Sequence, residues 1–253
     1  MKITLLGTGT SQGVPVIACN CPVCQSANAK DKRLRSSILI EKSGTTIVVD
    51  TGPDFRQQML THRVKKLDAV LFTHEHKDHT AGLDDVRSFN FSQKAPMDIY
   101  AEERVQKSIM REYLYAFEQS PYPGVPKLNM NTLVNKTFNI ANIEILPVRV
   151  MHHKLPVFGF RIDDFAYVTD VKTIPPEELE KLRNLDTLVL TALRKEPHIS
   201  HINLGEALKL IEKLSPKRTY LTHISHAFGF HEEINKELPT CVELGYDGLV
   251  LEF

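Results

Sequence analysis

The feature that most constrains this chain is a string of metal-competent side chains at residues 74–79, which reads His-Glu-His-Lys-Asp-His. The apolar residues 68–73 before it are typical of a short buried strand, and residues 80–86 predict a turn that enters a helix. The string therefore falls on a loop at the carboxyl end of a strand, where α/β proteins commonly carry their chemistry. A lone His-x-His can be an ordinary surface loop, but the full string after an apolar strand favours a metal site.

The spacing within the string predicts room for two metal ions. His74 and His76 are two residues apart on an extended loop, so both side chains can reach one ion. Asp78 and His79 are displaced far enough to serve a second ion beside it. Imidazole and carboxylate ligands suit zinc and tolerate manganese or iron, so the identity of the metal stays open.

Four further apolar runs end in an aspartate or a histidine, as the run before His74 does. They end at Asp50, His152, Asp170 and His223. A polar residue at the end of one strand is commonplace. Five such ends, all Asp or His, predict that the carboxyl edges of neighbouring strands converge and build a metal centre from distant parts of the sequence.

Composition excludes several classes of protein. The chain has 253 residues, 25% of them charged, and a formal net charge of zero, so no global field draws it to nucleic acid or to an anionic membrane. No run approaches eighteen apolar residues, and residues 1–7 read as a strand rather than a signal peptide. Three of the four cysteines lie at residues 19–24, which favours metal binding in a reducing compartment over disulfides. We therefore expect a cytoplasmic protein without a membrane partner.

Strand and helix signals alternate without a linker-like shift in composition, which predicts one domain over residues 1–253. The predicted helices span residues 102–117, 176–182 and 203–214, the last with Asn203 as its cap and Glu206 at the capping-box position. Residues 121–126 are rich in proline and predict a surface loop. Its aromatic residue makes it a candidate lid or the contact of a homodimer, although a plain connector explains it as well.

A glycine-rich stretch at residues 7–13 follows the first predicted strand, residues 2–6. A phosphate-binding loop would need a helix after the glycines, and no clear helix signal follows. A tight turn with close backbone approach is the better interpretation.

The string at residues 74–79 is the hallmark of the metallo-β-lactamase superfamily, which this sequence resembles along essentially its whole length. The resemblance implies an α/β fold of the α+β kind, a four-layered αβ/βα sandwich with a metal site at one edge. It also implies that His74, His76 and His152 hold the first metal and that Asp78, His79 and His223 hold the second. Asp170 would bridge the two metals, and Asp50 would orient the groups that bind them. His153 adjoins His152, but residues 154–160 resemble the family pattern after the ligand and favour His152.

Further motifs resemble the phosphodiesterase branch that contains the phosphoribosyl 1,2-cyclic phosphate phosphodiesterases. These motifs are residues 7–15, the cysteine motif at 19–24, and residues 82–87, 201–207 and 222–226. The resemblance implies a hydrolase that cleaves a small phosphodiester, cyclic ones included. Two divalent ions, zinc or manganese, can share a hydroxide for this attack and clamp the reacting oxygens.

Two rival functions stay open at this point. The superfamily includes nucleases that act on RNA or DNA ends, but the long basic arm of the tRNA-processing relatives is not evident and the net charge is zero. Nucleic acid is therefore the less favoured substrate. The other rival is a non-enzymatic module that binds metal or a partner, which the complete set of ligand residues disfavours.

His201 matches the histidine that protonates the leaving group in phosphodiesterase relatives, and together with Asp78 and Asp50 it completes the expected catalytic set. His198, three residues earlier, competes for this role. His198 could equally be a solvated loop residue, and a structural cap or surface histidine is the less favoured alternative for His201.

The cysteines predict a separate structural zinc site. Cys19, Cys21 and Cys24 supply three thiolates, while a closed zinc site needs four ligands. Cys241 could fill the fourth position, but His226 matches the fourth structural ligand of the cyclic phosphodiesterase branch. Three reduced, unliganded cysteines are the alternative.

Overall fold

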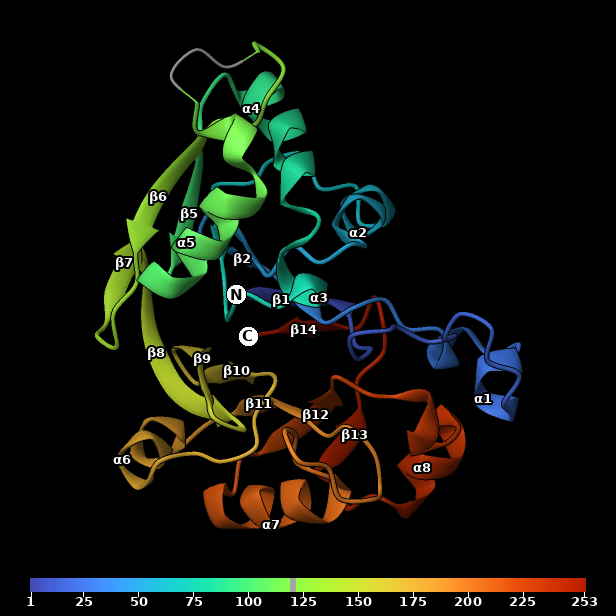
Figure 1. Cartoon of the computed structure of the whole chain (residues 1–253). Helices are drawn as coiled ribbons and strands as arrows, with labels where there is room; N and C mark the ends of the chain where they lie inside the picture. Colours follow the sequence, from blue (N-terminus) through green and yellow to red (C-terminus); the bar gives the residue numbers. More distant parts are fainter. Residues whose placement is uncertain (119–121) are drawn as a thin grey trace.

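The computed structural model describes residues 1–118 and 122–253 and consists of two seven-stranded sheets with helices on their outer sides (Figure 1). In spatial order, the first sheet contains β14 (Val250–Glu252), β1 (Lys2–Gly7), β2 (Ser37–Lys42), β3 (Thr45–Val49), β4 (Ala69–Leu71), β5 (Met97–Ala101) and β6 (Leu128–Thr132). The second contains β13 (Val242–Leu244), β12 (Arg218–Thr222), β11 (Thr187–Thr191), β10 (Phe165–Val168), β9 (Leu155–Ile162), β8 (Ile143–His152) and β7 (Phe138–Ile140).

The helices lie in two separate layers. α2 (Phe55–Thr61), α4 (Arg87–Gln93) and α5 (Glu103–Glu112) lie on the outer side of the first sheet, and α6 (Pro176–Leu179), α7 (Leu204–Leu214) and α8 (His231–Glu237) lie beside the second (Figure 1). The remaining short helical elements are α1 (Pro22–Gln25), α3 (Lys77–Thr80) and the 3-10 turns η1 (Ala29–Asp31), η2 (Leu83–Val86), η3 (Leu114–Ala116), η4 (Glu180–Leu182) and η5 (His226–Phe228). The predicted α/β sandwich is confirmed.

Alternation along the strands explains the layers. Ile47 and Val49 face the other sheet, whereas Val48 between them faces α2 and α4. In the second sheet Val189 faces inward, and Leu188 packs on the α7 side. Because successive side chains of a strand point to opposite faces, a strand covered on both sides must be apolar throughout. This requirement produces the continuous apolar runs of the sequence.

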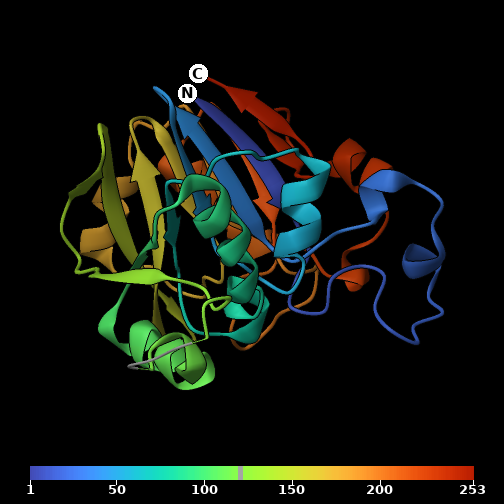
Figure 2. The same cartoon turned by 90° about the horizontal axis from the view of Figure 1, so that it is seen from above.

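The two ends of the described chain lie side by side (Figure 2). The amino group of Met1 donates to the carbonyl oxygen of Phe253 at 2.8 Å, and β1 pairs with β14 in antiparallel fashion.

In the described part of the chain, no helix is long and apolar enough to cross a membrane.

The helices predicted from the sequence are present, but their bounds differ from the predicted ones. The helix expected at residues 102–117 ends at Glu112, because the backbone of Tyr113 leaves the helical region at φ −109° and ψ 36°, and a 3-10 turn follows. The helix expected at residues 176–182 is α6 followed by η4. The capping box of α7 is confirmed, since Asn203 and Glu206 each accept a hydrogen bond from the other's backbone N–H.

Leu60 of α2 is 57% exposed, because Phe55 and Met59 fill the core side of that helix. Pro121 of the proline-rich loop lies outside the described residues, and Tyr122 is 78% exposed. The lid or homodimer role of residues 121–126, and the single domain over residues 1–253, stay predictions.

Candidate metal centre

Five strand ends meet at one edge of the sandwich, but the strands are not all neighbours as the sequence suggested. Asp50 and His74 follow β3 and β4 of the first sheet, whereas His152, Asp170 and His223 come at the ends of β8, β10 and β12 of the second. In that sheet β9 and β11 separate the three strands. The cluster therefore lies where the two sheets adjoin, and neither sheet could build it alone.

The His-Glu-His-Lys-Asp-His string is only partly a loop. His74 to His76 precede the helix, with His76 extended at φ −62° and ψ 150°, but Asp78 and His79 lie in the single turn of α3. Gly52 makes this turn possible, since a Cβ atom at that position would collide with the carbonyl oxygen of Asp78. The backbone N–H of Thr51 donates to the carbonyl oxygen of His79 at 2.8 Å and fixes the turn against the end of β3.

The first predicted ligand group comes together around His74. Its Nε2 lies 3.0 Å from Nδ1 of His76, and the ring of His152 lies 5.2 Å from that of His76. The Nδ1–H of His152 can donate to the carbonyl oxygen of Ser200 at 2.9 Å, which leaves the lone pair on its Nε2. His153 is exposed. The structure thus places His152, and not its neighbour, in the cluster.

The second predicted group is tighter. The ligand atoms of Asp78, His79, Asp170 and His223 all lie within 4.8 Å of one another. Nε2 of His79 lies 3.1 Å from Asp78 and 3.2 Å from Oδ2 of Asp170, and Nδ1 of His223 lies 3.2 Å from the same Oδ2. Both nitrogens are buried and have no hydrogen-bond partner among the described residues. Orphaned nitrogens that face carboxylates fit a divalent cation.

Asp50 is fully buried behind this group and does not face the cluster itself. Its carboxylate accepts hydrogen bonds from the backbone N–H of Thr73 at 2.9 Å, the Thr73 hydroxyl at 2.8 Å and Nδ1–H of His79 at 2.7 Å. These bonds fix the ring of His79 and direct its Nε2 toward Asp78 and Asp170.

Three of the strand-end residues have left-handed backbone conformations. The φ angles are +65° at Asp50, +54° at Asp170 and +57° at His223. Aspartate and histidine tolerate this region better than most residues do, but the conformation still costs energy. Residues that adopt it are found preferentially at functional sites. The backbone turns sharply at the end of each strand.

His201 lies between the two groups. Its ring is 4.4 Å from that of His152 and 4.8 Å from that of His223. Its Nδ1 is buried, lies 3.8 Å from Oδ1 of Asp170 and has no hydrogen-bond partner among residues 1–118 and 122–253. His198 stands farther out, with its ring 5.3 Å from His201 and its Nδ1 accepting from the backbone N–H of Ser200.

Burial and charge divide the site histidines into two kinds. Burial disfavours the charged form of His79, but Asp78, Asp170 and Asp50 outweigh it and raise the pKa of His79 well above its usual value. Burial also tends to raise the pKa of Asp170, but His223 and His79 outweigh it and hold that pKa well below its usual value.

The other site histidines favour the neutral form. Burial is the main cause that lowers the pKa of His74, His76 and His223. Burial, with His223 next in importance, also lowers the pKa of His201, to about 3. A neutral imidazole keeps the lone pair that a metal needs.

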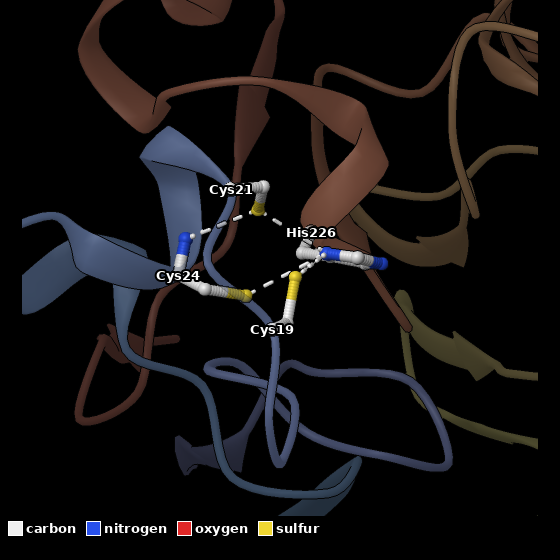
Figure 3. Close-up of side chains that lie close together, drawn as sticks. All are labelled: Cys19, Cys21, Cys24 and His226. Atoms are coloured by element: carbon white, nitrogen blue, oxygen red, sulfur yellow. Dashed lines mark hydrogen bonds between the residues drawn. The ribbon is translucent and has the colours of Figure 1, made fainter.

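The cysteine motif forms a second, separate cluster (Figure 3). Sγ of Cys19 and Sγ of Cys21 each lie 3.3 Å from Nδ1 of His226, and Sγ of Cys24 lies 3.5 Å from it. The thiols come from the loop before α1 and from α1 itself, and His226 begins η5. Cys241 is exposed and does not belong to this group of described residues.

The thiols of this cluster differ in acidity. The backbone N–H of Cys24 is the main cause that lowers the pKa of Cys21, to about 6, whereas burial raises the pKa of Cys24 to about 11. Three sulfurs and one imidazole nitrogen within reach of one point are the donor set of a structural zinc site.

Some residues that orient the cluster carry no signal in the sequence. Nδ1–H of His74 can donate to the Thr73 hydroxyl at 2.9 Å, and Thr10 lies with its Oγ1 3.1 Å from Nε2 of His223. Glu75 faces away from the cluster and pairs with Arg104, which also donates to the carbonyl oxygen of Pro156 at 2.7 Å. Thr73 directly precedes the string and Thr10 lies in the motif at residues 7–15, but neither was assigned a role beside a histidine from the sequence.

Fold and donor set together define the class of this protein as two-sheet α/β sandwiches with a candidate metal centre at one edge. A family model described as "Beta-lactamase superfamily domain" matches residues 45–224, and the chain belongs to the metallo-β-lactamase superfamily.

Two solved structures are similar to this chain over its whole length. A crystal structure described as a new diphosphatase from the PhnP family is 40% identical, covers 100% of this chain and 97% of its own, and superposes with a TM-score of 0.94. Zn²⁺-bound PqqB from Methylobacterium extorquens covers 100% of both chains with a TM-score of 0.82, but at 20% identity it shows the shared fold alone.

A Porphyromonas gingivalis protein named octanoyltransferase is 40% identical over 252 residues. The match includes 98% of this chain but 51% of that protein. The chain therefore spans about half the length of this curated relative.

The environment of the site histidines predicts that the metal-free protein loses stability at acidic pH. His74, His76, His201 and His223 have pKa values below the usual 6.5 in the folded state, so unfolding lets them take up protons. The free energy of unfolding should therefore fall as the pH drops from about 6.5 to about 5. His79, Asp50 and Asp247, whose pKa values are raised, act in the opposite sense, but the histidines with lowered pKa values outnumber them.

Urea unfolding of the chelator-treated protein across this pH window measures the effect. A His201→Gln variant should show a shallower pH dependence, and His153→Gln, which changes an exposed imidazole beside the site, serves as the control. A stability that is constant or rises on acidification would contradict the prediction.

Proposed function

We propose that this protein is a metal-dependent phosphodiesterase that cleaves a small phosphodiester, cyclic ones included. The observation that carries the proposal is that Asp170 belongs to two adjacent donor groups. Its ligand atoms lie within 4.8 Å of those of Asp78, His79 and His223 in one group and of His152 and His201 in the other. The full-length similarity to a PhnP-family diphosphatase supports chemistry at phosphorus rather than at a β-lactam carbonyl.

In this proposal the histidines and aspartates hold two divalent ions, zinc or manganese. His74, His76 and His152 bind the first ion, Asp78, His79 and His223 bind the second, and Asp170 contacts both. Two such ions supply Lewis acidity that activates water and stabilises the charge on the phosphoryl oxygens. Asp50 retains the proton on Nδ1 of His79 and so keeps its Nε2 available as a ligand.

The proposed role of His201 is to protonate the departing oxygen. Because burial lowers its pKa to about 3, this role requires that the negative charge of a bound phosphodiester raise that pKa. Its ring lies beside both donor groups, and its Nδ1 is not engaged by another described residue. His198 is already engaged with Ser200 and stands farther from the cluster, so it is the weaker candidate.

A diphosphate is the second candidate substrate, because the 40% identical solved structure is described as a diphosphatase. Cleavage of a phosphoanhydride and of a phosphodiester both displace an oxygen from phosphorus. A polynucleotide is less favoured by a net charge of zero. The name octanoyltransferase describes a protein about twice as long as this chain, and acyl transfer is not part of the proposal.

A substrate panel tests the proposed function. Phosphoribosyl 1,2-cyclic phosphate, bis(p-nitrophenyl) phosphate, a small diphosphate and an oligonucleotide are assayed with Zn²⁺ and with Mn²⁺. We expect turnover of the small phosphodiesters. Asp170→Ala should reduce it by more than the roughly 10–100-fold typical of losing an outer hydrogen-bond partner of a metal site.

His153→Ala is the matched control, since it removes an exposed imidazole next to a proposed ligand. Wild-type turnover and metal content in Asp170→Ala would contradict the assignment. Turnover of the oligonucleotide alone, with a steep salt dependence, would instead favour a nuclease.

The proposed acid makes a second prediction. His201→Ala should lower turnover roughly 10²–10⁴-fold for substrates with alkoxide leaving groups, because those need a proton as they depart. The loss should be much smaller for p-nitrophenolate, and the metal content should not change. His198→Ala is the control. Equal losses for both leaving groups would argue against the role of a general acid.

We also propose that Cys19, Cys21, Cys24 and His226 hold a third, structural zinc, which requires reduced thiols and fits a cytoplasmic protein. A variant with the three cysteines changed to serine should contain one zinc fewer per chain by elemental analysis and should still load the catalytic pair. Cys241→Ser, at an exposed thiol outside the group, should keep the wild-type zinc content. The same zinc content in the triple variant as in the wild type would refute this site.

A further inference from the structure

The glycine-rich turn at residues 7–13 packs against the strand end that carries His223. Ile224 donates from its N–H to the carbonyl oxygen of Thr8 at 2.9 Å, and the N–H of Thr10 donates back to the carbonyl oxygen of Ile224 at 3.1 Å. On the other side, the N–H of Gly9 donates to the carbonyl oxygen of Leu34 at 2.8 Å. The turn thus joins the first sheet to the end of β12. This structural role accounts for the turn without a bound phosphate.

This packing leaves Thr10 little freedom. Gly7 has no room for a side chain, because a Cβ atom there would collide with the carbonyl oxygen of Arg35. The N–H of Gly13 donates to the carbonyl oxygen of Thr10 at 2.8 Å and closes the turn. Both backbone polar groups of Thr10 are therefore engaged, and its side chain is 9% exposed.

The side chain of Thr10 faces a predicted metal ligand. Its Oγ1 lies 3.1 Å from Nε2 of His223, while Nδ1 of the same ring lies 3.2 Å from Oδ2 of Asp170 and has no hydrogen-bond partner in the described part of the chain. The two ring nitrogens thus point to different partners, one to a hydroxyl and one to the donor cluster.

Three other imidazoles of the cluster show the same division. The nitrogen that faces away from the cluster contacts an oxygen: Nδ1 of His74 the hydroxyl of Thr73, Nδ1 of His79 the carboxylate of Asp50, and Nδ1 of His152 the carbonyl of Ser200. Thr10 gives His223 the corresponding partner. Such a partner fixes which nitrogen carries the proton and how the ring is oriented.

We propose that Thr10 is a positioning residue for the second metal. Its hydroxyl accepts the Nε2–H of His223, so that Nδ1 keeps its lone pair and is presented together with Asp170 and Asp78. The inference rests on the proposed two-metal centre. It assigns the glycine-rich turn a part in metal retention.

A titration with Mn²⁺ alone tests the assignment, because manganese prefers imidazole and carboxylate over the thiolates of the cysteine cluster. Metal-free protein is titrated, and free Mn²⁺ is followed by its electron paramagnetic resonance signal. The wild type should bind two ions. In Thr10→Val the weaker ion should lose roughly 10–100-fold in affinity while the other is retained.

Thr10→Ser is the matched control, since it keeps the hydroxyl and should bind both ions nearly as the wild type does. Valine keeps the shape of threonine and every backbone bond of the turn. Unfolding in the presence of chelator verifies that each variant is folded. Undiminished affinity in Thr10→Val, or equal losses in the valine and serine variants, would overturn the role of the hydroxyl.

A spectroscopic measurement on the Zn²⁺-loaded wild type decides the case even if Thr10→Val does not fold. Long-range ¹H–¹⁵N correlation of the histidine rings should show the proton of His223 on Nε2. A proton on Nδ1 would overturn the proposal. Fewer than two Mn²⁺ ions on the wild type would overturn the two-metal centre itself and this inference with it, whereas failure of the valine variant alone would leave that centre in place.

Discussion

The structure depends on the neutralisation of carboxylates that the fold buries at the edge between its two sheets. Asp50 and Asp170 are almost completely removed from solvent. An unpaired charge at such a position would be far too costly for a marginally stable protein. Two N–H groups and a hydroxyl satisfy Asp50, and His79 lies between Asp50 and Asp170. The imidazole of His79 thereby links the ends of β3, β4 and β10. The same contacts stabilise both the fold and the donor cluster.

The layered architecture explains why the chemistry lies at this edge. Apolar side chains fill the space between the sheets and the spaces under the helices, where a polar group without a partner is costly and only a few, such as the hydroxyl of Tyr167, occur among the described residues. Loops at the strand ends are the first positions where polar side chains can face water on one side. His76 is exposed while His74 is buried, so the cluster spans the boundary between core and solvent.

The resemblance to the metallo-β-lactamase superfamily predicted the sandwich, and short-range patterns pointed to residues that the structure gathers at one centre. The string after β4 and the Asp or His at the other strand ends were visible because period-two burial and ligand chemistry are local. The division of the strands between two sheets was not visible, since it depends on pairing across long stretches of chain. Ser200 and Thr10 were missed for the same reason. Each contacts its histidine from more than forty residues away in sequence, so even the motif at residues 7–15, which contains Thr10, does not indicate which histidine it meets.

The left-handed backbone at Asp50, Asp170 and His223 has an evolutionary consequence. Each such residue costs on the order of 1–3 kcal/mol relative to a relaxed backbone. Glycine at any of these positions would relieve that cost and remove the donor or its support in the same step. Selection for stability alone would therefore erode the cluster. Aspartate and histidine at these three positions therefore lower backbone stability in exchange for donor groups that glycine could not supply.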